Sequence, residues 1–454
     1  MGKRVLIVGG DAAGMSAASQ VRRANPGLEV LVLERGEHVS YGACGIPYYV
    51  SGEIPAAEDL VALTPEDLAR RGIEVRLGHE VTEVKPGARQ VTARTADGRQ
   101  PSLRYDWLVL ATGAEPVRPA WPGVDLSGVV CLRGLGEGIA LRRWVDEASG
   151  SRAAVIGTGL LGLEMAEALA RRGIHTTLVG RAGQLLSAFD PEAVAPLAAA
   201  LQAVGVELAL GREVTGFTGA SGRVKAVTTT VDEISAELVL LALGVRPGTG
   251  LAREAGIGLG RTGAIAVSER MKTDAAGVYA AGDCTEVTHV VTGERVFSPL
   301  ALTANRTGRI AGDNLAAESL GRVSGQRFRG TAGSTVAQVA GFTVASTGLT
   351  PDQARTAGFE VAVFSREGRS RAAYYPGGTP LHTRIAVDRR TRRLLGAQMV
   401  GQEGVAGRID VFAAALFGRM TVDDVYHLDL AYSPPFGPVY DPVIEICGRA
   451  GLEL

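Results

Sequence analysis

The chain has 454 residues, of which 46% are hydrophobic and 21% are charged, a composition typical of a folded protein of about two to four domains. Its 47 Lys and Arg residues nearly balance 48 Asp and Glu residues, and a net charge of -1 excludes a general field that would hold nucleic acid or a membrane surface. No apolar run is long enough to span a membrane, and the first residues enter a strand and a glycine turn at once, which predicts a cytoplasmic protein. The cysteines and histidines show no metal-ligand spacing, so no metal site is predicted.

Residues 4–35 predict a strand, a glycine turn, a helix and a second buried parallel strand, which is the βαβ unit that binds dinucleotides. The turn runs from Gly9 to Gly14, but Asp11 occupies the place of the second glycine. A carboxylate there would repel a pyrophosphate unless it turned away. Glu34 ends the second strand, where an acid can accept hydrogen bonds from ribose hydroxyls; the alternative is a solvated charge at a strand end.

Cys44 follows this unit, between glycines and aromatic residues in the segment Ser40–Gly52. A redox-active thiol needs a stabilised thiolate, which a helix N-terminus can supply. The alternative is a buried structural cysteine. Position 49 is Tyr49, so an internal CxxxxC disulfide cannot form.

Residues 153–181 repeat the first pattern, and Gly173–Arg181 aligns with Gly27–Arg35 without a gap. The turn of this second copy has the full GxGxxG spacing, formed by Gly157, Gly159 and Gly162. Such glycines permit a tight turn, a close approach of backbone to a pyrophosphate, and packing of helix on strand. The chain therefore contains two dinucleotide-binding units.

The nucleotide preference of the second unit follows from the same alignment. Gly180 stands where the first unit has Glu34, and Arg181 follows it. Without a carboxylate there is no repulsion of a ribose 2′-phosphate, and a guanidinium can pair with it, which predicts NADPH over NADH. The alternative is that Gly180 only turns the chain and Arg181 points to water.

Two further segments fit a first domain that is split by an insertion. Leu108–Pro116 is a buried strand followed by Thr112 and Gly113, and Thr273–Cys284 places Asp283 after an apolar strand and a glycine. Together with the repeat, these segments resemble the pyridine nucleotide-disulfide oxidoreductases, a family that binds FAD and NAD(P)H.

The resemblance implies two Rossmann-like α/β domains and a C-terminal α+β dimerisation domain. The expected boundaries are 1–114 and 245–325 for the FAD domain, 115–244 for the NAD(P)H domain and 326–454 for the interface domain. FAD is expected at Gly9, Gly14, Glu34, Arg35, Thr112, Gly113 and Asp283, and NAD(P)H at Gly157, Gly159, Gly162, Gly180 and Arg181.

The segments SYGACGIPYY and LAYSPPFGPVYDP resemble the single-cysteine branch of this family, the coenzyme A-disulfide reductases and their relatives that act on persulfides. The resemblance implies that Cys44 forms a mixed disulfide with coenzyme A and that Tyr432 of the partner subunit in a homodimer assists proton transfer. Tyr374 is preferred to Tyr375 as the second tyrosine of that site. Contacts to coenzyme A are expected from Gln20, Arg22, Arg23, Ser40, Asn305 and Arg309, although Arg22 and Arg23 could also be a solvated helix end.

Departures from the family keep two alternatives open. Ala43 replaces the Asn that precedes the cysteine in the reductases, and Asp11 and Ala12 stand where the oxidases carry a catalytic His. The expected activity is transfer of electrons from NADPH through flavin and Cys44 to coenzyme A disulfide or another small disulfide or persulfide. The alternatives are an NAD(P)H oxidase and a flavoprotein sensor with slow turnover. No appended rhodanese domain is expected before the chain ends at Leu454.

Overall fold

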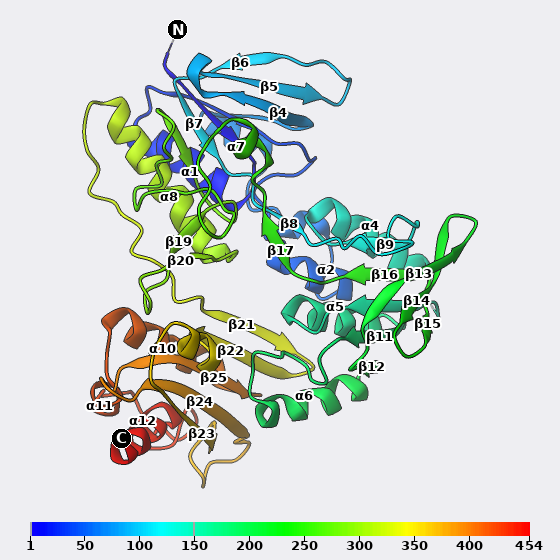
Figure 1. Cartoon of the computed structure of the whole chain (residues 1–454), viewed down its shortest axis with the longest axis vertical. Helices are drawn as coiled ribbons and strands as arrows, with labels where there is room; N and C mark the ends of the chain where they lie inside the picture. Colours follow the sequence, from blue (N-terminus) through cyan, green and yellow to red (C-terminus); the bar gives the residue numbers. More distant parts are fainter. Residues whose placement is uncertain (1, 149) are drawn as a thin grey trace.

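The computed structural model describes residues 2–148 and 150–454, which form two parallel α/β units and one antiparallel unit (Figure 1). The predicted fold class is therefore confirmed. The α/β units carry strands of aliphatic and β-branched residues that are buried on both faces, as expected for parallel sheets covered by helices.

The first sheet has the order β18-β7-β1-β2-β3, and all its pairs are parallel. Its strands are β1 (Arg4–Val8), β2 (Glu29–Leu33), β3 (Ile73–Arg76), β7 (Trp107–Leu110) and β18 (Val278–Ala280). Helix α1 (Ala12–Ala24) packs on α8 (Ala301–Ser319) so closely that a Cβ at Gly308 would lie 2.2 Å from the carbonyl oxygen of Ala13. The crossing of these helices thus requires that glycine. An antiparallel sheet of β4 (His79–Lys85), β5 (Gln90–Thr95) and β6 (Ser102–Arg104) lies beside this unit, with the short elements η2 (Ala57–Leu60), α3 (Pro65–Arg70), η3 (Pro86–Ala88) and α7 (Gly250–Glu254).

The second sheet has the order β12-β11-β10-β16-β9 and is also parallel. Its strands are β9 (Val129–Cys131), β10 (Arg152–Ile156), β11 (His175–Gly180), β12 (Val206–Leu210) and β16 (Leu238–Leu241); its helices are α4 (Leu135–Glu147), α5 (Leu160–Arg171) and α6 (Pro191–Ala203). A meander of β13 (Val214–Ala220), β14 (Arg223–Thr229) and β15 (Glu233–Ser235) lies beside it. In each α/β unit the first strand of the repeat lies centrally and pairs in parallel with the second.

The chain passes between these units through a two-stranded antiparallel ribbon, β8 (Ala114–Pro116) with β17 (Val245–Pro247). The boundaries that we propose at 114/115 and 244/245 fall at this ribbon. Helix α2 (Ile46–Ser51) departs from a simple division, because Ile46 and Val50 are buried in one apolar cluster with residues of the second unit. A Cβ at Gly138 of α4 would lie 2.7 Å from the Ile46 side chain, which shows how closely α2 is packed there.

The third unit is an antiparallel sheet of order β21-β22-β25-β24-β23. Its strands are β21 (Thr335–Val339), β22 (Phe342–Gly348), β23 (Val361–Arg369), β24 (Pro380–Asp388) and β25 (Leu394–Gly401), and its helices are α9 (Pro351–Thr356), α10 (Val405–Gly418), α11 (Val422–Tyr426) and α12 (Pro442–Glu453). Helix α10 begins six residues before the apolar run Val411–Gly418 from which it was predicted. Its first turns contain Arg408, whose buried guanidinium donates to Asp441 at 2.8 Å, so a polar residue there is compatible with a helix.

Candidate active site

A cavity of about 430 Å³ lies at the carboxyl ends of the first sheet, where β1, β2 and β7 end. The predicted flavin residues that line it are Gly9, Glu34, Arg35, Thr112 and Gly113. Gly14 lies beneath it, where a Cβ would come within 1.9 Å of the carbonyl oxygen of Gly9. The structure therefore brings these residues together at the edge of the sheet where dinucleotides bind in such folds.

The carboxylate of Glu34 is fixed by the backbone around it. One of its oxygens accepts a hydrogen bond from the N–H of Gly10 at 2.8 Å, and the other accepts from the N–H of Gly36 at 2.7 Å. Each carboxylate oxygen can accept a second hydrogen bond, so both remain able to accept from the hydroxyls of a ribose. This geometry fits the predicted role of Glu34 better than a solvated strand end.

Asp283 and Asp11 each present a buried carboxylate oxygen, Oδ1, that has no hydrogen-bond partner within residues 2–148 and 150–454. The pKa of each carboxyl group is raised to about 6, by burial in both cases and, for Asp11, also by the neighbouring charges of Glu34 and Asp283. Buried polar atoms are normally paired, so these two orphaned oxygens indicate that a ligand with polar groups belongs here. FAD has hydrogen-bond donors in the hydroxyls of its ribityl chain and acceptors in its phosphate oxygens, and it therefore fits this edge of the sheet.

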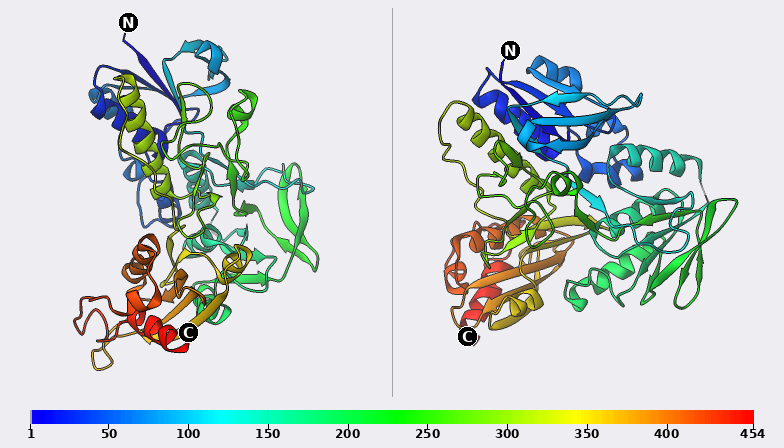
Figure 2. Two further views of the ribbon diagram at one scale, coloured as in Figure 1. Left: turned by 60° about the vertical axis from the view of Figure 1, so that its left-hand side comes forward. Right: turned by 45° about the horizontal axis from the view of Figure 1, so that its top comes forward.

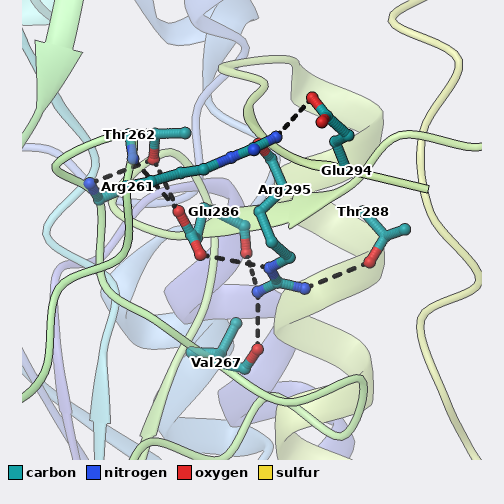
Figure 3. A network of polar contacts seen from close by, with 8 residues as sticks. Arg261, Thr262, Val267, Glu286, Thr288, Glu294 and Arg295 are labelled. Atoms are coloured by element: carbon teal, nitrogen blue, oxygen red, sulfur yellow. Dashed lines mark hydrogen bonds and ion pairs between the residues drawn. The ribbon is translucent and has the colours of Figure 1, made fainter. Parts of the chain in front are cut away.

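A network of polar contacts holds the segment that follows Asp283 (Figure 3). The buried carboxylate of Glu286, in β19 (Glu286–Thr288), accepts from the Thr262 hydroxyl at 3.0 Å and from Arg295 at 3.3 Å. Arg295, in β20 (Arg295–Phe297), also donates to the carbonyl oxygen of Val267 at 2.6 Å. These contacts tie the strand after Asp283 to the loop that precedes β18.

Cys44 lies in η1 (Ala43–Gly45), directly before α2, and its thiol is exposed in a cavity of about 590 Å³. Side chains from α5 and α8 and from β21 of the third unit line this cavity, so all three units contribute to it. The surrounding walls still desolvate the thiol: burial raises its pKa, as do the charges of Glu164, Asp11 and Asp283. We expected a helix N-terminus to stabilise the thiolate of Cys44, but burial and the surrounding acidic side chains of this chain favour the neutral thiol instead.

Glu164 of α5 is a member of this cavity that the sequence reasoning missed. Its pKa is raised to about 7 by burial and by the charge of Glu167, against a hydrogen bond from Tyr48 that lowers it. An acid two residues after Gly162, inside an otherwise apolar stretch of helix, was the signal that could have identified it.

A groove of about 390 Å³ brings together most of the predicted substrate residues, namely Gln20, Arg23, Ser40, Asn305 and Arg309. Ser40 has a left-handed backbone with φ 52°, and its N–H donates to the carbonyl oxygen of Gly10 at 2.9 Å. Arg22 lies elsewhere, because its guanidinium donates to the carbonyl oxygens of Pro26 at 2.6 Å and Leu28 at 2.9 Å.

The nucleotide turn of the second unit has the geometry predicted for its glycines. Gly157 has φ 121°, and a Cβ at Gly162 would lie 1.9 Å from the carbonyl oxygen of Gly157. A Cβ at Gly159 would meet no atom within 4 Å, so backbone is open to a ligand there. At Gly180, a Cβ would meet the Thr158 methyl group at 2.4 Å, which gives this glycine a packing role as well. Arg181 is exposed.

The structure also brings Tyr374 and Tyr432 together, with their hydroxyl oxygens 2.8 Å apart. This hydrogen bond raises the pKa of Tyr432. Tyr375 is only half-exposed, and its ring lies 5.8 Å from the guanidinium of Arg371. Tyr374 lies in the connection between β23 and β24, and Tyr432 lies in the connection between α11 and α12. In Figure 1, β23, β24 and α12 lie at the end of the molecule that carries the C-terminus, whereas α2 lies near its middle, and Figure 2 shows the C-terminal end from two further sides.

Comparison with known proteins identifies the family of this chain. Residues 3–307 match the family described as pyridine nucleotide-disulphide oxidoreductase, and residues 336–442 match its dimerisation domain. The chain belongs to this family. An NAD(P)H sulfur oxidoreductase (CoA-dependent) from Pyrococcus abyssi is 40% identical over 98% of this chain and 97% of that protein. An NADH oxidase from Methanocaldococcus jannaschii is 33% identical over 97% of each chain. The solved structure of an NAD-dependent persulfide reductase from A. fulgidus has a TM-score of 0.94 at 34% identity and covers 99% of this chain and 83% of that one.

Membership in this family makes the protein an oxidoreductase that uses a flavin and a nicotinamide nucleotide. Within residues 2–148 and 150–454, no helix is both long and apolar enough to cross a membrane. Over the same residues, no group of three or more His, Cys, Asp or Glu side chains is arranged to hold a metal ion.

Proposed function

We propose that this protein reduces low-molecular-weight disulfides or persulfides, with coenzyme A disulfide as the preferred acceptor, and that Cys44 is the residue that reacts with the acceptor sulfur. The observation that supports the proposal is that the groove and the cavity of Cys44 adjoin each other at residues 42–44 and at α8. Gly42 lines the groove that contains Arg23 and Arg309, while Cys44 lines the adjoining cavity. An acceptor with an anionic nucleotide end and a sulfur end can occupy both at once.

Names of relatives support the same acceptor class. The Pyrococcus abyssi relative is named for dependence on CoA, and a Staphylococcus aureus relative at 27% identity over 98% of this chain is named coenzyme A disulfide reductase. In this chain no cysteine stands five residues after Cys44, since that position is Tyr49. A lone thiol must use the acceptor's own sulfur as its disulfide partner.

Bound FAD supplies the transfer of an electron pair from the nicotinamide to sulfur. The residues of this chain handle the sulfur and the proton. The thiolate of Cys44 attacks one acceptor sulfur, the S–S bond breaks, and the other half leaves as a thiolate. Two-electron reduction of the mixed disulfide then returns Cys44 to the thiolate and releases the second thiol.

Protonation of the leaving thiolate is assigned to the hydroxyl of Tyr432, with Tyr374 as its hydrogen-bond partner. Both side chains are exposed, with 44% of Tyr432 and 75% of Tyr374 accessible, and neither lines the cavity that contains Cys44 of the same chain. The match to a dimerisation domain at residues 336–442 supports a homodimer in which each tyrosine pair serves the partner subunit's Cys44.

A test of the shared site mixes Cys44→Ser and Tyr432→Phe subunits. Each heterodimer then contains one site with both wild-type residues, so random exchange should restore about a quarter of wild-type activity from two weakly active homodimers. No recovery would show that Cys44 and Tyr432 do not act across the dimer. Wild-type subunits carried through the same exchange control for losses during mixing.

Cys44→Ser tests the chemistry directly. The variant should keep its flavin and the bleaching of flavin absorbance by nucleotide, yet lose disulfide reduction by about a thousandfold or more, because serine is not a thiol nucleophile. Cys131→Ser, at a half-buried free thiol in β9, is the matched control and should retain activity. Full reductase activity of Cys44→Ser would refute the proposal.

An NAD(P)H oxidase is the second candidate, and relatives named NADH oxidase favour it. Against it, the first glycine turn contains no His, because Asp11 and Ala12 stand where the oxidases carry their catalytic histidine. Oxygen consumption with and without coenzyme A disulfide separates the two activities. A slow-turnover sensor would instead keep its flavin reduced with every acceptor tried.

We propose NADPH as the preferred nucleotide. Arg181 is exposed next to the ligand-facing turn of the second unit, and no carboxylate stands at Gly180. The preference expected from one charge-assisted pair is on the order of ten- to a hundredfold in kcat/KM.

A further inference from the structure

Asp11 stands at a turn position that is normally glycine in dinucleotide-binding units. The second glycine of such a turn lets the backbone approach a pyrophosphate. In the second unit that place is Gly159, where a Cβ would meet no atom within 4 Å. In the first unit the same place holds Asp11, and its carboxyl group lines both the flavin cavity and the groove beside it.

The side chain of Asp11 does not turn away into solvent. Its Oδ1 is buried and has no hydrogen-bond partner within the described ranges 2–148 and 150–454. Asp11 is the N-cap residue of α1, yet its side chain makes no capping hydrogen bond with that helix. A buried carboxyl oxygen left without a partner indicates that its partner belongs to the ligand.

Charges of both signs face Asp11, since Arg35 and Arg133 line the flavin cavity beside it together with Glu34. Burial is the main cause that raises the pKa of Asp11; the charges of Glu34 and Asp283 raise it too, while the backbone N–H groups of Ala12 and Tyr41 lower it. Arg23 and Arg309 line the same groove. No ion pair joins either arginine to Asp11 among the residues that the structure describes.

Flavin phosphates at this turn would add further negative charge, and a like charge favours the protonated acid. A protonated carboxyl group also has a hydrogen-bond donor, which a phosphate oxygen can accept, whereas a carboxylate has none. We propose that Asp11 takes up one proton as FAD binds and donates it in a hydrogen bond to a phosphate oxygen of the cofactor. Protonation of Asp11 therefore replaces a repulsion between its carboxylate and the phosphates by a hydrogen bond.

The experiment measures release of FAD from the holoenzyme, followed by the rise in flavin fluorescence on dilution, from about pH 6.5 to about pH 8.5. If one proton is bound together with the cofactor, the Kd for FAD rises by about tenfold per pH unit over this range. Asp11→Asn replaces the acid by an amide that can donate without titrating. Its Kd should stay close to that of the wild type near pH 6.5 and should not change with pH.

Asp283→Asn is the matched control, since Asp283 is the other buried acid with an orphaned oxygen. This variant should bind FAD more weakly yet retain the pH slope. A slope that survives in Asp11→Asn, or that disappears only in Asp283→Asn, would place the proton elsewhere and overturn the proposal. If Asp11→Asn does not retain flavin, Asp11→Gly restores the glycine pattern and should bind FAD without a pH slope. The readout uses flavin release alone, so it is independent of which sulfur compound is reduced.

Discussion

The first and second βαβ units have the same turn geometry and differ in the side chains that face their ligands. Gly14 and Gly162 are equivalent, because a Cβ at either position would lie 1.9 Å from the carbonyl oxygen of the turn's first glycine. The ligand-facing positions are not equivalent: the first unit carries Asp11 and Glu34, and the second carries Gly159 and Gly180. One backbone design therefore serves two nucleotides, and acidic side chains distinguish the two sites.

The largest effect is expected from filling the shared turn. Gly14→Ala and Gly162→Ala each place a methyl group against a carbonyl oxygen of the backbone, which cannot move without opening the turn, at a cost of about 3 kcal/mol or more. Gly14→Ala should purify without flavin. Gly162→Ala should retain flavin, with KM for the nucleotide raised by about tenfold or more.

Absorbance of bound flavin and steady-state kinetics measure the two outcomes. Gly136→Ala, in α4, is the control, since a Cβ there would meet no atom within 4 Å. If both turn variants behaved alike, the assignment of the units to different nucleotides would be wrong.

The next effect concerns the acid that the second unit lacks. In Glu34→Gln one carboxylate oxygen becomes an amide N–H₂ that faces the backbone N–H of Gly10 or Gly36. Loss of one charge-assisted hydrogen bond costs about 1.5–3 kcal/mol, so FAD should bind on the order of ten- to a hundredfold more weakly. Flavin fluorescence during dilution measures this change. Glu37→Gln, on an exposed neighbour, should leave the affinity unaltered.

Arg181→Ala tests the nucleotide preference of the second unit. Removal of the guanidinium should lower kcat/KM for NADPH by roughly ten- to a hundredfold and leave that for NADH nearly unchanged. Arg143→Ala, at an exposed position in α4, is the matched control. If the wild type had an equal or higher kcat/KM with NADH, NADPH would not be its preferred nucleotide. Gly180→Glu is a less direct probe, because its Cβ would first displace the methyl group of Thr158.

The glycine pattern made the two units predictable, because each turn glycine answers a local steric demand that is visible in sequence. Contacts between distant elements carried no such signal. Tyr374 and Tyr432 lie 58 residues apart in loops, and only the fold brings their hydroxyl groups within 2.8 Å. Similarly, the apolar side chains of Ile46 and Val50 predict burial without naming the second unit as their partner.

The direction in which a side chain points also could not be predicted from the sequence. The sequence placed Arg22 and Arg23 together at a helix end, yet adjacent helical residues point in different directions. Arg23 lines the groove, whereas Arg22 satisfies backbone carbonyl groups on another side of α1. Charge alone could not separate these two roles.

The smallest effect is expected where the two units meet, at Cys44 and Glu164. Because the charge of Glu164 raises the pKa of the Cys44 thiol, Glu164→Gln should increase the thiolate fraction and accelerate alkylation by iodoacetamide at pH 8 by roughly two- to fivefold. The pH dependence supplies an internal control. With a pKa of about 7, Glu164 is largely neutral below about pH 6, so wild-type and variant rates should converge there. A rate ratio that is independent of pH would show that the variant changes access to the thiol rather than its charge environment.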